Sequence, residues 1–401
     1  MTMSLQGAPL AGVKVLEIGH YIAAPHCAMM LADQGADVIK VEPAGGEPGR
    51  KAPPYSAAGE SLAFACHNRG KRSVALDLRR TESGEALEAL LRWADIVVTN
   101  YAYGIPEKLG FGFDRLSQVN PRAPMIHITG FGQEDDRRDY LAFDPAIQAM
   151  SGFSDLTGDA EGPPTISQFF VADHAAGMVA AYAAMCALWE ARATGRGRFV
   201  PVSMLEAMTS QLSYHIPTRG AAGKSPTRFA RAPEAFDFFP TRDAPMYLAA
   251  GTPASWRAFS QLMGRPEWAP DPKKRPNLLE NPDLKAEVDA VAGAWFAART
   301  SAEALDALQR AAIPCGAVRS VAQLYDEEVA AGSAVVSFVD LAGGGPPAPV
   351  PGPAVTFPGA PADRARVASL GEHNAAVLAE LGVPADIVAA LTAADRPAVP
   401  A

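Results

Sequence analysis

Short apolar runs alternate with amphipathic stretches over the first 150 residues of the chain. Five runs rich in β-branched residues predict strands at 13–19, 36–42, 72–78, 95–100 and 124–132. The intervening stretches PHCAMMLADQG and TESGEALEALLRWA are typical of helices. Apolar strands that alternate with helices indicate a mostly parallel sheet covered on both faces. The pattern therefore predicts a doubly wound α/β domain, in which ligands bind beyond the carboxyl ends of the strands.

A long run dominated by small apolar residues follows this region. It reads FFVADHAAGMVAAYAAMCALWEARATGRGR and occupies residues 169–198. We expect a helix that begins near Asp173 and ends where Gly195 and Gly197 supply a stop signal. The next segment, VPVSMLEAMTSQLSYH, predicts a short strand and another helix.

The composition changes in the second half of the chain. Residues 216–240 are rich in glycine, proline and charge without a sustained period, so we expect a linker or mobile loop. Residues 241–330 predict a smaller α+β domain, with a strand at MYLAA and helices at SWRAFSQLMG and KAEVDAVAGAWFAAR. The proline-rich residues 341–364 predict an extended surface strap before two terminal helices, NAAVLAELG and ADIVAALTAA.

Length, composition and charge narrow the class of protein. A chain of 401 residues exceeds the size at which one hydrophobic core usually stops growing, so two domains are expected. Apolar residues at 48% and charged residues at 20% are typical of a globular protein rather than a disordered one. The net charge of -9 and the absence of basic clusters argue against a nucleic-acid partner.

Cysteine spacing and the N-terminus bear on the cellular compartment. The four cysteines form no C-x-x-C pair, which argues against a disulfide framework and against a zinc site. The first residues lack a charged start followed by an apolar signal core, and no run approaches about 18 uninterrupted apolar residues. We therefore expect a cytoplasmic protein that does not engage a membrane.

Several common site motifs are absent from the chain. The turn EIGHYIAAPH holds one glycine where a dinucleotide fingerprint needs three, and GFGFD does not follow a strand, so NAD and ATP are disfavoured. No H-E-x-x-H motif occurs, and we assign His26, His67 and His174 to the surface or the core, with no metal site. No G-x-S-x-G motif is present to expose a nucleophilic serine.

Asp173 has two interpretations. As an N-cap it would accept hydrogen bonds from the first free amides of the helix, which stabilises a helix by about 1 kcal/mol. As a nucleophile it would be kept ionised by the helix N-terminus and attack a carbonyl carbon. The small neighbours Ala172, Ala175, Ala176 and Gly177 fit either room for a bulky substrate or close helix packing.

A resemblance favours the nucleophile. The segments LAGVKVLEIGHYIAAP, LADQGADVIKVEP, NRGKRSVALDL, FDPAIQAMSG, ADHAAGM, TGRGRFVPVSMLEAM, IPCGAV and LGEHNAAVL occur in the order typical of one family. The chain resembles the class III CoA-transferases, the group of formyl-CoA and carnitine CoA-transferases and α-methylacyl-CoA racemases. The similarity covers essentially the whole chain.

The resemblance implies a fold and an assembly. A Rossmann-like large domain would comprise residues 1–215 and be completed by residues 331–401, with 216–240 as linker and 241–330 as the small domain. Two subunits would interlock as linked rings, so an obligate homodimer is expected. No permanently bound cofactor is implied, since coenzyme A (CoA) and acyl-CoA are substrates.

The resemblance also implies site residues. Asp173 would be the nucleophile that attacks an acyl-CoA thioester. The residues expected to contact CoA are Tyr21, Ile22, Ala23, Leu76, Asp77, Leu78, Arg79, Asn100, Tyr101, Ala102, Lys108, Ala142, Phe143 and Asp144. The family's NFRPG segment is NYAYG in this chain, so one expected cationic contact to CoA is missing.

Three functions follow from these observations. Transfer of CoA between two carboxylic acids is favoured, because the racemase branch needs a histidine where this chain has Phe143. An acyl-CoA racemase or epimerase is the alternative. A catalytically weak CoA-binding paralogue is a second alternative, suggested by the missing arginine.

Overall fold

The chain forms two compact units. The structure, a computed structural model, describes residues 7–159, 161–228, 236–278, 280–357 and 365–394. Unit 1 comprises Met1–Asp155, Thr165–Ser225 and Ser333–Ala401, and unit 2 comprises Leu156–Pro164 and Pro226–Gly332. Unit 1 therefore combines segments from both ends of the chain.

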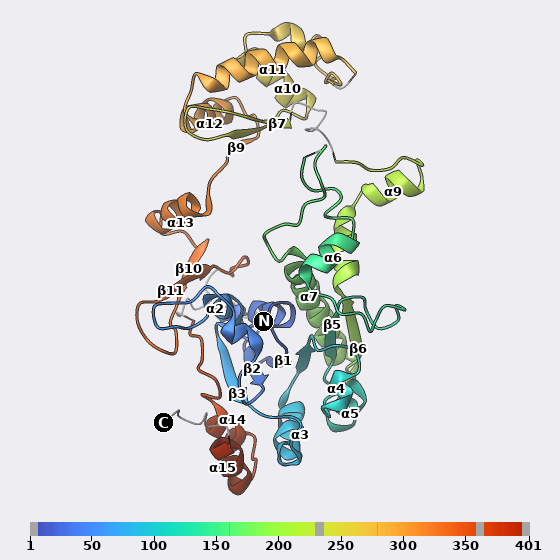
Figure 1. Cartoon of the computed structure of the whole chain (residues 1–401), viewed down its shortest axis with the longest axis vertical. Helices are drawn as coiled ribbons and strands as arrows, with labels where there is room; N and C mark the ends of the chain where they lie inside the picture. Colours follow the sequence, from blue (N-terminus) through green and yellow to red (C-terminus); the bar gives the residue numbers. More distant parts are fainter. Residues whose placement is uncertain (1–6, 160, 229–235, 279, 358–364, 395–401) are drawn as a thin grey trace, which may run out of the picture. The chain divides into compact units, whose positions relative to one another are not determined.

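Unit 1 is built around a six-stranded parallel sheet (Figure 1). Its strands are β1 (Lys14–Ile18), β2 (Asp37–Glu42), β3 (Lys71–Ala75), β4 (Ile96–Thr99), β5 (Met125–Thr129) and β6 (Phe199–Ser203). They lie in the order β3-β2-β1-β4-β5-β6, which is the order of the doubly wound dinucleotide-binding fold. The predicted doubly wound α/β fold is confirmed.

Helices cover both faces of this sheet. Unit 1 contains α1 (Ala23–Asp33), α2 (Leu62–Asn68), α3 (Gly84–Trp93), α4 (Ile105–Lys108), α5 (Phe113–Val119), α6 (Asp144–Met150), α7 (Val171–Thr194), α8 (Met204–Thr209), α9 (His215–Gly220), α14 (Asn374–Glu380) and α15 (Ala385–Ala394). Side chains alternate along each strand, so Val15 packs into a core with α1, α7 and α8. The next residue, Leu16, packs into a second core with α3, α5, α14 and α15.

The C-terminal segment covers the edge of the sheet at β3. Figure 1 shows α14, in red, beside the blue strand β3, and α15 packs against α14. The backbone N–H of Ala75 donates to Oδ1 of Asn374 at 2.8 Å, across 299 residues of sequence. The N–H of His373 donates to the carbonyl of Ser73 at 3.0 Å. An edge strand with free backbone groups would otherwise be a template for pairing with another chain.

The helix α7 is a core helix of unit 1. Its buried residues include Ala172, Ala175, Ala176 and Gly177, which favours the interpretation that these small residues serve helix packing. A Cβ atom added to Gly177 would lie 2.9 Å from the carbonyl oxygen of Ala23 in α1. By length and composition α7 would be able to cross a membrane, but half of its most apolar stretch is buried inside the protein. This burial indicates a core helix rather than a membrane span.

Unit 2 packs helices on a small antiparallel sheet. Its strands β7 (Phe236–Phe239), β8 (Met246–Ala249) and β9 (Cys315–Ala317) lie in that order. Its helices are α10 (Pro253–Leu262), α11 (Pro282–Ala297), α12 (Ser301–Arg310) and α13 (Val321–Ala330). The core is aromatic: Trp256, Phe259 and Phe296 are fully buried, and Nε1 of Trp256 donates to the carbonyl of Trp268 at 2.9 Å.

The two glycine- and proline-rich segments contain short regular elements. Residues 216–240 include most of α9 and all of β7, and residues 229–235 between them lie outside the described part of the chain. Within 341–364, β11 (Ala348–Pro351) pairs antiparallel with β10 (Val336–Val339), so this part of the expected strap is a hairpin strand. Residues 358–364 of that strap lie outside the described residues.

Candidate active site

Asp173 lies in the first turn of α7 but does not cap that helix. The N-cap residue is Phe170, which offers no side-chain acceptor. The free amides are instead satisfied by Asp144 at the start of α6. Oδ2 of Asp144 accepts the backbone N–H groups of Ala172 at 2.6 Å and of Asp173 at 3.1 Å. The N-cap interpretation of Asp173 is therefore wrong, because a carboxylate from another helix performs that role.

The environment of Asp173 favours its protonated form more than expected. Its side chain is half-buried, and burial raises its pKa to about 7. The negative charge of Asp144 is the second contribution to this value and acts in the same direction as burial. The expectation that the helix N-terminus keeps this carboxylate fully ionised at neutral pH is corrected, since loss of solvent and a neighbouring like charge oppose ionisation.

Asp173 is also available for chemistry. In the described part of the chain, no side chain donates a hydrogen bond to its carboxylate oxygens. A carboxylate whose pKa is raised is more basic, and therefore a better nucleophile in its ionised form, than an ordinary surface aspartate. The geometry thus presents an unpaired nucleophile next to a helix start.

The turn after β1 is held by contacts from the segments that follow β4 and β2. The N–H of His20 donates to Oδ1 of Asn100 at 2.9 Å, and Nδ2 of Asn100 donates to the carbonyl of His20 at 2.9 Å. Tyr21 has a positive φ of 60°, and its N–H donates to Oε2 of Glu47 at 3.0 Å. These bonds fix a left-handed backbone at the carboxyl end of β1, where a ligand is expected in this fold.

A buried network of charged side chains contacts this turn and the strands next to it. Nζ of Lys40 lies 2.6 Å from Oε1 of Glu17, and Nζ of Lys71 lies 2.7 Å from Oε2 of the same residue. Lys40 also lies 3.3 Å from Glu47 and donates to the carbonyl of Gly19 at 3.2 Å. Burial lowers the pKa of Lys71 to about 8 even though Glu17 opposes this effect. The network connects β1, β2 and β3 next to the turn.

Two hollows lie at the ends of β3 and β4. One has a volume of about 350 Å³ and is lined by Leu78, Arg79, Arg80, Thr81, Ser83, Gly84, Leu87, Glu88, Leu91, Lys108, Leu109, Gly110 and Arg115. The other has a volume of about 280 Å³ and is lined by Ile18, Val41, Glu42, Pro43, Leu76, Asp77, Leu78, Arg79, Tyr101 and Leu109. The structure therefore places six of the residues expected to contact CoA around two adjoining hollows: Leu76, Asp77, Leu78, Arg79, Tyr101 and Lys108.

Sequence reasoning missed two basic residues of the larger hollow. Arg80 and Arg115 line it together with Arg79 and Lys108. Arg80 directly follows the predicted segment, whereas Arg115 belongs to α5 and is not among the residues expected to contact CoA. Arg79, Arg80 and Arg115 each face a carboxylate, of Asp77, Glu82 and Glu88 respectively. An anionic ligand such as a phosphate group would therefore share these cations with their present partners.

The other residues expected to contact CoA differ in their exposure to solvent. Ala23 is buried at the start of α1, so only its backbone can face a ligand, while Ala102 is exposed after β4. Phe143 is 66% exposed and its ring lies edge-on to Tyr21, with centroids 6.2 Å apart. This contact joins the turn after β1, which includes Ile22, to the segment 142–144 that reaches α7. Asp173 itself lines neither of the two hollows.

Comparisons with known proteins agree with one another. A family model described as "CoA-transferase family III" matches residues 10–374. The chain is 32% identical to the succinyl-CoA:mesaconate CoA-transferase of Haloarcula hispanica, with 93% of this chain and 96% of that protein covered. It is equally 32% identical to the succinate–glutarate CoA-transferase of Agrobacterium fabrum, with the same coverage of both chains.

A solved structure supports the same relationship. The crystal structure of a CAIB/BAIF family protein from Brucella suis matches with a TM-score of 0.81 and 28% sequence identity. The match covers 94% of this chain and 100% of that chain. Sequence and fold are thus similar over nearly the full length.

Proposed function

The chain belongs to CoA-transferase family III, and from that membership we propose that it moves CoA between an acyl-CoA thioester and a carboxylic acid through a covalent intermediate on Asp173. The observation that carries this mechanism is the placement of Asp173. Its half-buried carboxylate has a raised pKa, no donor among the described side chains, and a position in a helix turn that Asp144 already caps.

The proposed catalytic cycle passes through two anhydrides and one thioester of Asp173. An oxygen of Asp173 attacks the thioester carbonyl of the donor, the carbon–sulfur bond breaks, and CoA leaves as a thiolate. The thiolate attacks the aspartyl carbonyl and releases the donor acid, leaving an aspartyl-CoA thioester. The acceptor carboxylate then attacks that thioester and forms a second anhydride. Attack of the thiolate on the acceptor carbonyl yields the new acyl-CoA and restores the carboxylate of Asp173.

We propose that the larger hollow binds the phosphate groups of CoA. Arg79, Arg80, Lys108 and Arg115 surround it, and each carries a positive charge that attracts a phosphate. Arg80 and Arg115 would supply the cationic contact that the NYAYG segment lacks. The adjoining hollow, with Leu76, Leu78 and Tyr101 in its wall, offers an apolar surface for the adenine ring.

The acceptor is proposed to be a short dicarboxylic acid. Two of the relatives are named for succinyl-CoA with mesaconate and for succinate with glutarate, and succinate, mesaconate and glutarate are all dicarboxylates. The racemase alternative lacks a second base at position 143, since the exposed Phe143 packs against Tyr21 and cannot accept a proton.

We also propose the homodimer and the cytoplasmic location that the sequence resemblance implies. The helix α7 supports the first of these, because Met178, Tyr182 and Trp189 lie along one of its faces and are 50%, 73% and 79% exposed. Large apolar side chains gathered on one helix face are typical of a protein–protein contact surface.

A trapping experiment tests the covalent intermediate. The enzyme is incubated with succinyl-CoA and hydroxylamine without acceptor, and tryptic peptides are read by mass spectrometry. Hydroxylamine attacks the aspartyl-CoA thioester and leaves a hydroxamate, which we expect on the peptide that contains Asp173. An unmodified peptide from an enzyme that still exchanges CoA would exclude this intermediate. Solvent deuterium at the α-carbon of the acyl group without an acceptor would instead support the racemase.

Asp144→Asn is expected to move the acidic limb of the pH profile to lower pH. The attack needs ionised Asp173, so activity falls as the pH drops through its pKa of about 7. Asp144 raises that pKa by its charge, and a neutral amide in its place lets the pKa fall. Asparagine retains an oxygen that can cap α7. The measurement is kcat/KM for CoA exchange as a function of pH.

Asp114→Asn is the matched control for this shift. Asp114 is an exposed acidic residue in the first turn of α5, which packs on the opposite face of the sheet from α7. The pH profile of Asp114→Asn should coincide with that of the unmodified enzyme. If the acidic limb of the pH profile stays in place in Asp144→Asn, the charge of Asp144 does not raise the pKa of Asp173. An equal shift of that limb in Asp114→Asn would contradict the same claim.

A further inference from the structure

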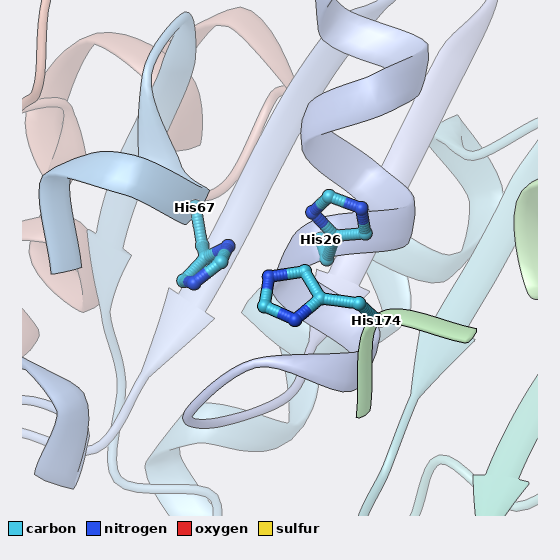
Figure 2. A group of neighbouring side chains, drawn as sticks. All are labelled: His26, His67 and His174. Carbon is cyan, nitrogen blue, oxygen red and sulfur yellow. The ribbon is translucent and has the colours of Figure 1, made fainter. Parts of the chain in front are cut away.

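Three histidines that are far apart in the sequence lie together in unit 1. His26 belongs to α1, His67 to α2 and His174 to the first turn of α7, and their side chains converge (Figure 2). The ring centroid of His174 lies 4.8 Å from that of His26 and 5.2 Å from that of His67. One nitrogen atom of each ring lies within 4.8 Å of the other two. We propose that these imidazoles bind one divalent transition metal ion of the zinc type.

The hydrogen bonds of the three rings leave nitrogen atoms free to act as ligands. Nδ1 of His174 donates to the carbonyl of Phe170 at 2.7 Å, so Nε2 keeps its lone pair. A bond from the second ring nitrogen to a backbone carbonyl is the usual way in which proteins orient a metal-binding histidine. Nδ1 of His26 and Nδ1 of His67 are buried without a hydrogen-bond partner among the described residues. Unpaired buried nitrogens are costly, and a bound ion would satisfy them.

Nearby charges permit a cation at this position. Arg69 and Lys71 are close enough to affect the histidines, but each has a buried acidic partner. Arg69 makes a bidentate contact with Asp33 at 2.8 and 2.6 Å, and Lys71 lies 2.7 Å from Glu17.

The spacing fits a site that closes slightly on binding. Zinc–nitrogen bonds of about 2.0 Å in a tetrahedron place two ligand nitrogens about 3.3 Å apart. The rings must therefore approach by at most about 1.5 Å, a movement within reach of side-chain rotation. All three histidines line a cavity of about 660 Å³ that Met30, Met178 and other residues complete, which leaves a fourth coordination position open to water.

The proposed ion would connect three helices next to the nucleophile. Its ligands come from α1, α2 and α7, and His174 directly follows Asp173. An ion bound only to the folded chain stabilises that fold and fixes the first turn of α7. Neutral imidazole donors suit zinc, nickel and cobalt rather than magnesium or calcium. The site does not depend on the proposed CoA-transfer mechanism.

Metal binding by the full chain is the direct test. The protein, freed of any polyhistidine tag and treated with a chelator, is titrated with Zn²⁺ in a calorimeter, and Co²⁺ is added to a separate sample. We expect one Zn²⁺ per chain, a higher thermal midpoint with Zn²⁺, and visible absorption bands of nitrogen-coordinated Co²⁺. The absence of saturable Zn²⁺ binding and of Co²⁺ bands in the unmodified chain would overturn the proposal.

Variants locate the site. His67→Ala and His174→Ala are each expected to weaken Zn²⁺ binding by at least about 100-fold, the upper end of the loss seen when an outer-shell partner is removed. His215→Ala, at the start of α9, is the matched control and should bind as the unmodified chain does. Circular dichroism establishes that each variant is folded before titration. Unchanged binding in both folded ligand variants, or equal loss in His215→Ala, would contradict the assignment.

Discussion

Asp173→Asn is expected to lower kcat for CoA exchange by at least about a thousandfold, because an amide is too weak a nucleophile to open a thioester. Asparagine has nearly the volume of aspartate, and Asp144 rather than Asp173 caps α7, so the helix should persist. Binding of CoA to the basic hollow should also persist, since Asp173 does not line it. Exchange between succinyl-CoA and labelled glutarate, followed by mass spectrometry, gives the rate.

Two further variants make this result decisive. Asp173→Ala guards against slow deamidation of asparagine back to aspartate and should be equally inactive. Glu190→Gln removes one negative charge from the exposed far end of the same helix and should retain full activity. If Asp173→Ala exchanges CoA within tenfold of the unmodified rate, the covalent mechanism is wrong.

Glu17→Gln is expected to lower the free energy of unfolding by about 3–5 kcal/mol, the cost of leaving a buried charge without its partner. Both carboxylate oxygens of Glu17 are in use, one with Lys40 and one with Lys71, and all three side chains are nearly inaccessible to solvent. Glutamine fits the space but carries no charge. Lys40 keeps Glu47 at 3.3 Å, so the loss falls mainly on Lys71. Urea denaturation followed by circular dichroism measures the change.

An ion pair near the surface is the control for this stability change. Glu380 lies 2.6 Å from Arg72, and its side chain is 50% exposed. Glu380→Gln is expected to change the free energy of unfolding by less than about 1 kcal/mol, because exposed ion pairs are screened by water. Equal losses in the two variants would show that burial of the Glu17 network has no special effect.

The sequence predicted the sheet because apolar periodicity is local information. The runs that form β1 to β5 carry their own signal, and Gly195, with a φ of 73°, ends α7 where the pattern expects. The cap of α7 was not predictable in this way. Asp144 lies 29 residues from the amide of Asp173 that it accepts, and only the folded chain brings the two together.

The same limit applies to the candidate site. Residues 76–79 and Lys108 were found through ordered motifs, and the structure places them around shared hollows. Arg115 is not among the expected CoA contacts, because it shares a hollow with Lys108 only once α5 lies beside α4. His26, His67 and His174 lie on three different helices, so no spacing within one helix reveals that they form a cluster.

The coverage of β3 by the C-terminal segment has a consequence for how the protein is made. Asn374 and His373 bond to β3, yet Asn374 is synthesised 299 residues after its partner Ala75. A growing polypeptide on the ribosome must therefore carry this edge of its sheet uncovered until residues 373 and 374 have been made. Nascent chains in that state are open to pairing with one another. A chain truncated before Asn374 would keep this hazard permanently.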